Sequence, residues 1–156
     1  MRSPRVSNPR ICSINDAMAI VGRKWVVVIL RELLLNETTR FDDIVYETGI
    51  PRDILSSRLR DLEVSGLLMR ERYSDRPARY EYRLTATGKD LYGVVQSIRT
   101  WGDIHLRNDP EYASDFVHDC GRIFHAKVVC SECGEELHAG DSHTTTDYHR
   151  SDTLVG

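Results

Sequence analysis

The chain has 156 residues, of which 40% are hydrophobic and 29% are charged. This length fits one domain, or one small domain with an appendage, and excludes an assembly of several large domains. The longest apolar run, Trp25–Leu30, is too short to span a membrane. Since the Arg-rich segment 1–10 leads into no apolar stretch of the secretory type, we expect a cytoplasmic protein without a membrane partner.

The charge is unevenly distributed along the chain. Residues 1–108 hold 18 Lys and Arg against 14 Asp and Glu, whereas residues 109–156 hold 3 against 10. A basic N-terminal part and an acidic C-terminal part indicate two units with different roles. Eight arginines fall between Arg52 and Arg83. Arginine suits bidentate contacts to phosphate and guanine, but genomic base composition explains an Arg-rich chain equally well.

Helical spacing of apolar residues dominates the first half of the chain. Residues 1–12 read as an arm, and Ser13 is a suitable N-cap for a helix from residue 14 to residue 21. The next helix, over residues 24–35, is apolar around most of its circumference, which predicts a central buried helix. A short helix over residues 41–47 ends at a turn around Gly49.

A further helix is predicted over residues 51–65, with Pro51 in its first turn. At 100° per residue, Leu55, Leu59 and Leu62 fall on one face and predict contact with the core. The opposite face is small and polar, which suits close approach of the helix backbone to DNA. This face comprises Asp53, Ser56, Ser57 and Arg60.

Two short strands follow, over residues 67–73 and 80–84, with Arg76 and Arg79 in the link between them. A long helix is then predicted from residue 86 to residue 106, with an apolar stripe at helical spacing. Helix, tight turn, helix and hairpin form a helix-turn-helix with a wing. The predicted fold class is therefore α+β, mainly α.

Residues from about 12 to 106 resemble the HxlR-type winged-helix transcriptional regulators, which are related to the MarR group. The resemblance rests on stretches that keep the family's order and spacing. They are Gly22–Trp25, Ile29–Leu33, Arg40–Phe41, Leu55–Leu62, Gly66–Leu67, Arg79–Thr85, Gly88 and Trp101–Gly102. The domain boundaries that follow are 13–108 for this unit, 109–139 for a Cys-rich extension and 140–156 for a polar tail.

The resemblance implies a homodimeric regulator that binds double-stranded DNA at a bacterial nucleoid. The residues expected to contact DNA are Arg40, Arg52, Asp53, Ser56, Ser57, Arg60, Arg76 and Arg79. The residues expected to build the dimer interface on the first and last helices are Ile14, Met18, Leu91, Val95, Ile98 and Trp101. Packing within one protomer is the alternative for this second set.

The start of the helix at 51–65 departs from the family pattern. Many relatives have Ser-Pro-Lys there, whereas this chain has Pro51-Arg52-Asp53. A carboxylate repels phosphate, so Asp53 must face a base edge, pair with Arg52 or be neutralised. The departure leaves the operator sequence open.

Cysteine usage suggests two further sites. Cys12 precedes the first helix, where the helix dipole and Arg10 favour a thiolate, and it resembles the sensing thiol of HxlR-like regulators that respond to oxidants. A small buried apolar residue is the alternative. In the extension, Cys120, Cys130, Cys133 and His118 predict a structural zinc site of Cys3His type, with His125 and His138 as reserve ligands. A redox dithiol and a knuckle that no longer binds metal are the alternatives.

An enzyme is not expected, because the sequence has no phosphate loop, nucleophile elbow or His-Glu-x-x-His motif. The remaining alternative is a winged-helix adaptor that binds protein instead of DNA. A small-molecule effector between the dimer helices is a further expectation, although no residue set identifies it.

Overall fold

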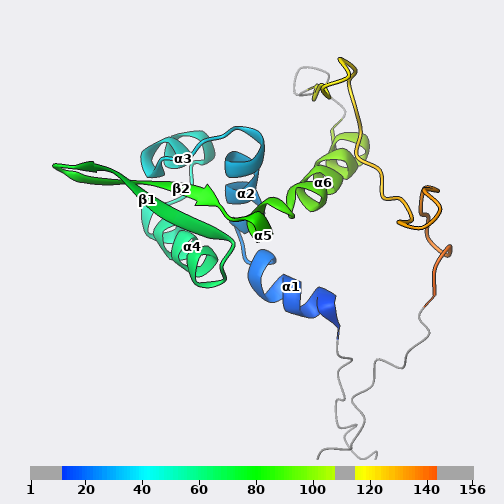
Figure 1. Cartoon of the computed structure of the whole chain (residues 1–156), viewed down its shortest axis with the longest axis horizontal. Coiled ribbons are helices and arrows are strands. Elements are labelled where there is room, and N and C mark those ends of the chain that lie inside the picture. The colour runs from blue at the N-terminus through cyan, green and yellow to red at the C-terminus, as the bar shows by residue number, and fades with distance from the viewer. Residues whose placement is uncertain (1–11, 108–114, 144–156) are drawn as a thin grey trace, which may run out of the picture.

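The computed structural model describes residues 12–107 and 115–143. Six helices and one antiparallel hairpin make up the regular structure of these ranges, which confirms the predicted α+β class (Figure 1). Within them, no helix is both long enough and apolar enough to cross a bilayer. The elements are α1 (Ser13–Val21), α2 (Val26–Leu35), α3 (Phe41–Thr48), α4 (Arg52–Val64), β1 (Leu68–Asp75), β2 (Ala78–Leu84), α5 (Ala86–Lys89) and α6 (Tyr92–His105).

Helix α2 is the centre of the core, as its apolar composition predicts. Its residues Ile29 and Leu30 are fully buried against α3, α4 and the base of the hairpin. Leu55, Leu59 and Leu62 of α4 are also buried, which confirms the predicted inner face of that helix. Each such side chain contributes about 1.5–3 kcal/mol when it leaves water. The opposite, polar face of α4 is thereby turned outward.

The helix-turn-helix formed by α3 and α4 turns at Gly49, as predicted. Gly49 adopts a left-handed backbone (φ +66°), and its N–H donates to the Val45 carbonyl at 2.9 Å. Two predicted helix starts are wrong by one residue. Cys12, and not Ser13, is the N-cap of α1, and Pro51 is the N-cap of α4 instead of its first helical residue.

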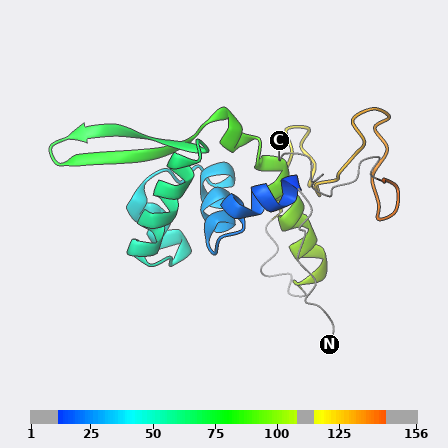
Figure 2. The ribbon, with the colours of Figure 1, turned by 90° about the horizontal axis from the view of Figure 1, so that it is seen from below.

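The wing is longer than the sequence indicates. The strands continue to Asp75 and from Ala78, so the predicted six-residue link shrinks to Arg76-Pro77. An irregularity between Arg72 and Ser74 shifts the register of the pair. Period-two alternation ends before the tip because both faces of the hairpin are solvated there, and this hides the strand ends from sequence analysis. The hairpin projects well beyond α3 and α4 (Figure 2).

The predicted single helix over residues 86–106 is wrong, because the chain forms two helices there. The Thr85 hydroxyl caps the short helix α5 by accepting the Gly88 N–H at 3.2 Å, and α6 begins only at Tyr92. Gly88 is pressed against the hairpin base: a Cβ there would lie 2.0 Å from the Leu67 carbonyl oxygen. This close contact fixes α5 on the core, and α6 then runs as a separate helix with one side packed on α2 (Figure 1).

Hydrogen bonds fasten the wing to the helix-turn-helix. The Tyr82 N–H donates to the Thr39 carbonyl at 2.8 Å, directly before α3. The loop that carries Thr39 is held by buried Glu32, whose carboxylate accepts from the Asn36 side chain at 2.9 Å. The wing and the helix-turn-helix are therefore joined directly by hydrogen bonds.

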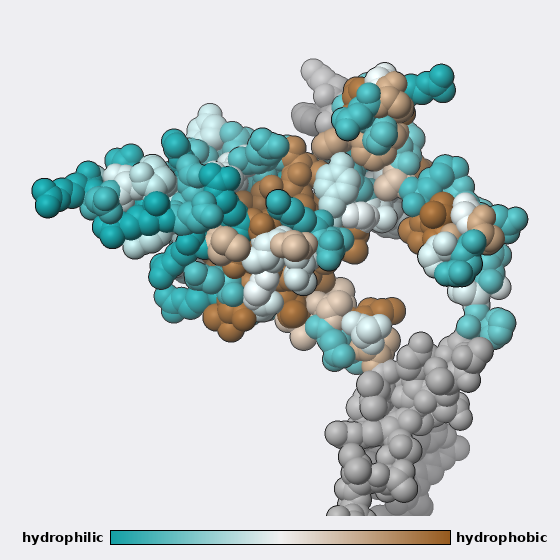
Figure 3. Space-filling view, viewed as in Figure 1, coloured by the Kyte–Doolittle hydropathy of each residue, from teal (hydrophilic) through white to brown (hydrophobic). Residues whose placement is uncertain are grey.

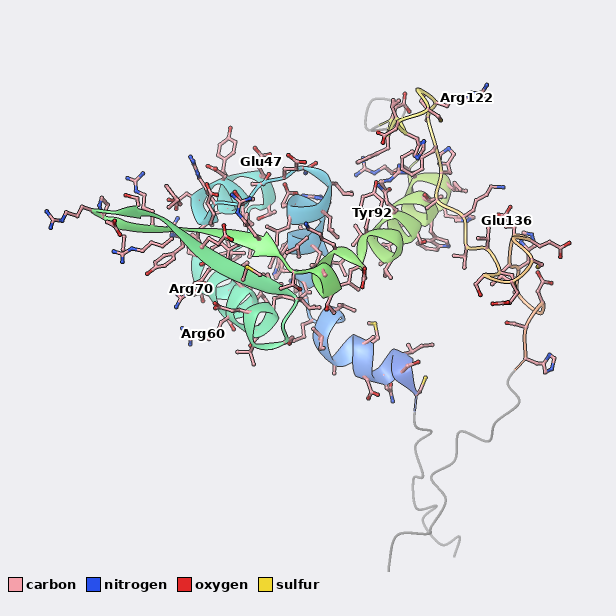
Figure 4. The ribbon with its side chains drawn as sticks, viewed as in Figure 1. Glu47, Arg60, Arg70, Tyr92, Arg122 and Glu136 are labelled. Atoms are coloured by element: carbon pink, nitrogen blue, oxygen red, sulfur yellow. The ribbon has the colours of Figure 1, made fainter. Side chains whose placement is uncertain are left out.

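The described segment 115–143 contains three tight turns, two of which are closed by isolated bridges. Isolated bridges pair Val117 with Ile123 and Val129 with Glu136, and the labelled residues Arg122 and Glu136 mark the two turns (Figure 4). The backbone N–H of Ala126 donates to Thr100 of α6 at 2.9 Å. The extension is thus attached to the last helix of the domain.

Candidate nucleic-acid interface

The exposed face of α4 carries the residues that the sequence assigns to it. Asp53, Ser56, Ser57 and Arg60 are all exposed on the side opposite the buried leucines. Arg60 extends from α4 into solvent (Figure 4). The face therefore combines small side chains, which allow close approach, with donors and one long cation.

The eight arginines between Arg52 and Arg83 fall into two groups. Five of them form ion pairs with acidic side chains of the same chain at 2.7 to 3.6 Å, so their charges are compensated. These pairs are Arg52–Asp42, Arg58–Asp61, Arg70–Glu63, Arg72–Asp75 and Arg83–Glu71. Composition alone does not separate the groups. Arg58–Asp61 and Arg72–Asp75 are local pairs three residues apart, whereas the other three depend on how α3, α4 and the two strands are placed.

The second group consists of Arg60, Arg76 and Arg79. Their side chains are exposed and, within the described ranges, form no ion pair or hydrogen bond. Arg76 lies in the turn at the tip of the wing, and Arg79 follows on β2. Hydrophilic surface gathers over this hairpin, whereas apolar patches lie toward α2 and α6 (Figure 3). One uncompensated cation thus lies on the polar face of α4 and two lie on the wing.

Arg40 and Arg52 line a hollow of about 420 Å³ between the first residues of α3 and α4 and the wing. Arg40 donates to Glu81 at 3.3 Å and lies 4.9 Å from the centre of the Tyr73 ring. Arg52 donates to Asp42 at 2.7 Å. Both guanidinium groups therefore already have acidic partners within the chain.

Asp53 does not pair with Arg52, which removes one of its three predicted roles. Arg52 instead pairs with Asp42 and lies 4.9 Å from the centre of the Phe41 ring. The exposed Asp53 carboxylate forms no ion pair with any described residue. The two roles that remain for Asp53 are contact with a base edge and neutralisation.

The first and last helices expose apolar side chains. Ile14, Met18, Ile98 and Trp101 are between 49% and 69% exposed, and α1 has no buried residue at all. Val95 is buried in the core of the protomer and partly buried Leu91 packs against that core, which agrees with the alternative of packing within one protomer, and their place in a dimer interface stays a prediction. One side of α6 thus packs inward while Ile98 and Trp101 remain uncovered.

Cys12 is half-buried at the N-cap of α1, and its side chain makes no capping hydrogen bond. Arg10, its predicted cationic neighbour, lies outside the described residues. The position at a helix N-terminus is as predicted, and the sensing role stays a prediction.

Cys130 and Cys133 lie together in the second turn of the extension. Hydrogen bonds from the backbone N–H groups of Cys133 and then of Glu132, together with one from the Cys133 side chain, lower the pKa of the Cys130 thiol. Gly134 completes the turn in a left-handed backbone (φ +77°). The two cysteines thus share one turn that ends at Gly134, and the zinc knuckle stays a prediction.

The other predicted zinc ligands do not join this pair. No group of three or more His, Cys, Asp or Glu side chains suited to a metal occurs in the described ranges, which include His118, Cys120, His125 and His138. The Nδ1 atom of His118 accepts the Cys120 N–H at 3.2 Å. The four predicted ligands are therefore not gathered at one point in the described ranges, and zinc binding stays a prediction.

Sequence analysis missed the residues that attach the extension to α6. Arg99 donates to Gln96 at 2.6 Å, to Asp103 at 2.8 Å and to the Phe124 carbonyl at 3.3 Å, and its guanidinium lies 4.3 Å from the centre of the Phe116 ring. Residues 96, 99, 100 and 103 recur at i, i+3, i+4 and i+7. A polar stripe at this spacing signals a helix face that binds another polar segment.

Comparison with known proteins agrees with this architecture. The HxlR-like helix-turn-helix family model matches residues 20–110. The HTH-type transcriptional regulator Rv3095 of Mycobacterium tuberculosis is 40% identical over 128 residues, which span 81% of this chain and 80% of Rv3095.

Solved structures show the same similarity. PA1607, a candidate transcription factor, superposes with a TM-score of 0.76 at 27% identity, over 87% of this chain and 95% of PA1607. Because residues 1–107 are only about two thirds of the chain, that match extends into the extension. The reduced redox regulator HypR gives a TM-score of 0.55 at 26% identity, over 60% of this chain and 92% of HypR.

These relatives are transcriptional regulators and not enzymes. The range that the family model matches includes α3, α4 and the wing described above. The chain therefore belongs to the HxlR-like helix-turn-helix family of transcriptional regulators.

Proposed function

We propose that this regulator acts in the cytoplasm as a homodimer that binds a specific double-stranded DNA sequence. The observation that carries the proposal is the placement of Arg60, Arg76 and Arg79. Arg60 on the polar face of α4 and Arg76 and Arg79 on the wing are exposed and uncompensated, whereas the other five arginines between Arg52 and Arg83 are paired. An isolated charge of this kind gains most from a phosphate.

The proposed docking places the N-terminal part of α4 in the major groove. Ser56 and Ser57 then lie close to base edges, and Arg60 reaches a base or a phosphate. Arg76 at the wing tip contacts the DNA backbone or the adjacent minor groove of the DNA. Paired Arg40 and Arg52 would have to exchange their acidic partners for phosphate, so we assign them a smaller share of the affinity.

The exposed residues of α1 and α6 support the homodimer. Ile14, Met18, Ile98 and Trp101 are apolar side chains that are about half exposed or more, and Met18 and Ile98 line one hollow. Monomers seldom leave large apolar patches uncovered. A two-fold dimer of winged domains binds an inverted repeat, with half-site centres separated by about one DNA turn of 34 Å.

Two signals are proposed for this regulator. Cys12 is a candidate thiol sensor at the start of α1, and the similarity to a redox regulator supports it. A hollow of about 430 Å³ between α2 and α6, bordered by Phe116, is a candidate site for an apolar effector. Iodoacetamide labelling of Cys12 in the folded protein tests the first, and protection of Cys12 from labelling would contradict it.

Selection of random duplexes on the purified protein at two salt concentrations tests DNA binding. We expect an enriched inverted repeat and a steep fall of affinity with salt. Repeating the selection with Ser57→Ala should change the preferred base at one position of each half-site. The absence of enrichment, together with salt-insensitive capture of a protein partner, would favour the adaptor instead.

A further inference from the structure

The turn around Cys130 and Cys133 brings two thiols together in an accessible place. The Gly134 N–H donates to the Cys130 carbonyl at 2.9 Å, and the Cys130 N–H donates to the Glu135 carbonyl at 2.9 Å. Cys130 and Cys133 therefore lie three residues apart within one hydrogen-bonded turn. Cys133 is exposed and Cys130 is half-buried, so small solutes reach the pair.

The segments that flank this turn hold it in shape. The Leu137 N–H donates to the Val128 carbonyl at 2.9 Å, and the Lys127 ammonium donates to the Glu136 carboxylate at 2.5 Å. These contacts close a small hairpin around the turn. The two sulfurs therefore stay neighbours without help from another part of the chain.

A pair of thiols supports a disulfide but does not complete a zinc site. Structural zinc takes four ligands. In the part of the chain that the structure describes, no third donor joins Cys130 and Cys133, and the Nδ1 atom of His118 is occupied by the Cys120 N–H. The observed geometry thus favours oxidation of the pair over metal binding.

We propose that Cys130 and Cys133 are a redox-active dithiol that hydrogen peroxide oxidises to a disulfide within the extension. One sulfur attacks peroxide, which gives a sulfenic acid and water. The second sulfur displaces the hydroxyl group as a second water and forms the S–S bond. Two thiols and one peroxide thus yield one disulfide and two waters. The step does not depend on DNA binding.

Mass spectrometry of the reduced full-length protein after exposure to peroxide tests the proposal. We expect the loss of two hydrogens per chain, mapped to the peptide that contains both cysteines, and recovery on treatment with dithiothreitol. Cys130→Ser and Cys133→Ser should each abolish this loss and leave a sulfenic acid that dimedone traps. Cys120→Ser is the matched control in the neighbouring turn and should oxidise like the parent protein.

Three results would overturn the proposal. The first is the absence of a mass change at peroxide concentrations that convert free glutathione completely. The second is a disulfide that links two chains through Cys12 or Cys120 and persists in Cys130→Ser. The third is zinc bound at one ion per chain that shields the thiols from peroxide until it is chelated and is lost in Cys120→Ser. The third result would establish the predicted zinc site instead.

Discussion

Arg76 and Lys89 carry the same charge in the same domain but occupy different surroundings. Arg76 lies at the tip of the wing, whereas Lys89 lies on α5. Arg76→Ala should weaken binding to all duplexes alike and reduce the slope of log K against log salt by about 0.9, because one phosphate is no longer neutralised. Fluorescence anisotropy at several salt concentrations measures both. Lys89→Ala is the control, and an equal effect of both variants would contradict the proposed docking.

Gly88 shows the strongest steric demand of any described glycine. A methyl group there would overlap the Leu67 carbonyl oxygen, which belongs to the backbone and is itself bonded to the Thr85 N–H. Gly88→Ala should therefore lower the free energy of unfolding by about 3 kcal/mol, near the upper end for overpacking. Urea denaturation measures the loss.

Gly93 provides the matched comparison for this prediction. A Cβ at Gly93 meets nothing within 4 Å, and the residue lies inside α6. Gly93→Ala should raise the free energy of unfolding by about 0.5–1 kcal/mol through helix propensity. Similar stabilities of the two variants would show that α5 is not pressed against the hairpin base.

At the scale of elements, we expect Arg99 to hold the extension against α6. Arg99→Ala removes three hydrogen bonds and the packing of the guanidinium on the Phe116 ring. We expect faster amide exchange over residues 115–126, by about tenfold if roughly 1.4 kcal/mol of docking energy is removed. Arg122→Ala, on an exposed turn of the same extension, should leave the exchange unchanged. Unaltered exchange in Arg99→Ala would show that other interactions hold the segment.

The helices also show what the sequence predicts well and what it does not. The inner face of α4 was predictable because Leu55, Leu59 and Leu62 follow one helical period. The break between α5 and α6 was not, because Leu91 continues the apolar stripe across it and the cause is a tertiary contact at Gly88. Likewise, the pairing of Arg52 with Asp42 depends on how α3 and α4 pack, which no local pattern records.

At the scale of the whole molecule, the uncovered surface of α1 and α6 predicts self-association. Ile98→Glu should shift the dimer toward monomer, because a carboxylate buried in an apolar interface costs several kcal/mol. Analytical ultracentrifugation measures the change in dissociation constant. Val64→Glu alters an equally apolar, 83% exposed residue at the end of α4 and should leave association unchanged. Dimers of normal affinity in Ile98→Glu would place the interface elsewhere.

The attachment of the wing to the loop before α3 has a consequence for how such a regulator is switched. The Tyr82–Thr39 hydrogen bond and the Arg40–Glu81 and Arg70–Glu63 ion pairs leave the wing little freedom relative to α4. In the proposed dimer, each winged domain would then bind its half-site as one rigid unit. A signal received at α1, α6 or the extension would act by changing the distance between the two winged domains, and the proposed operator would be released when that distance no longer matches the pitch of the duplex.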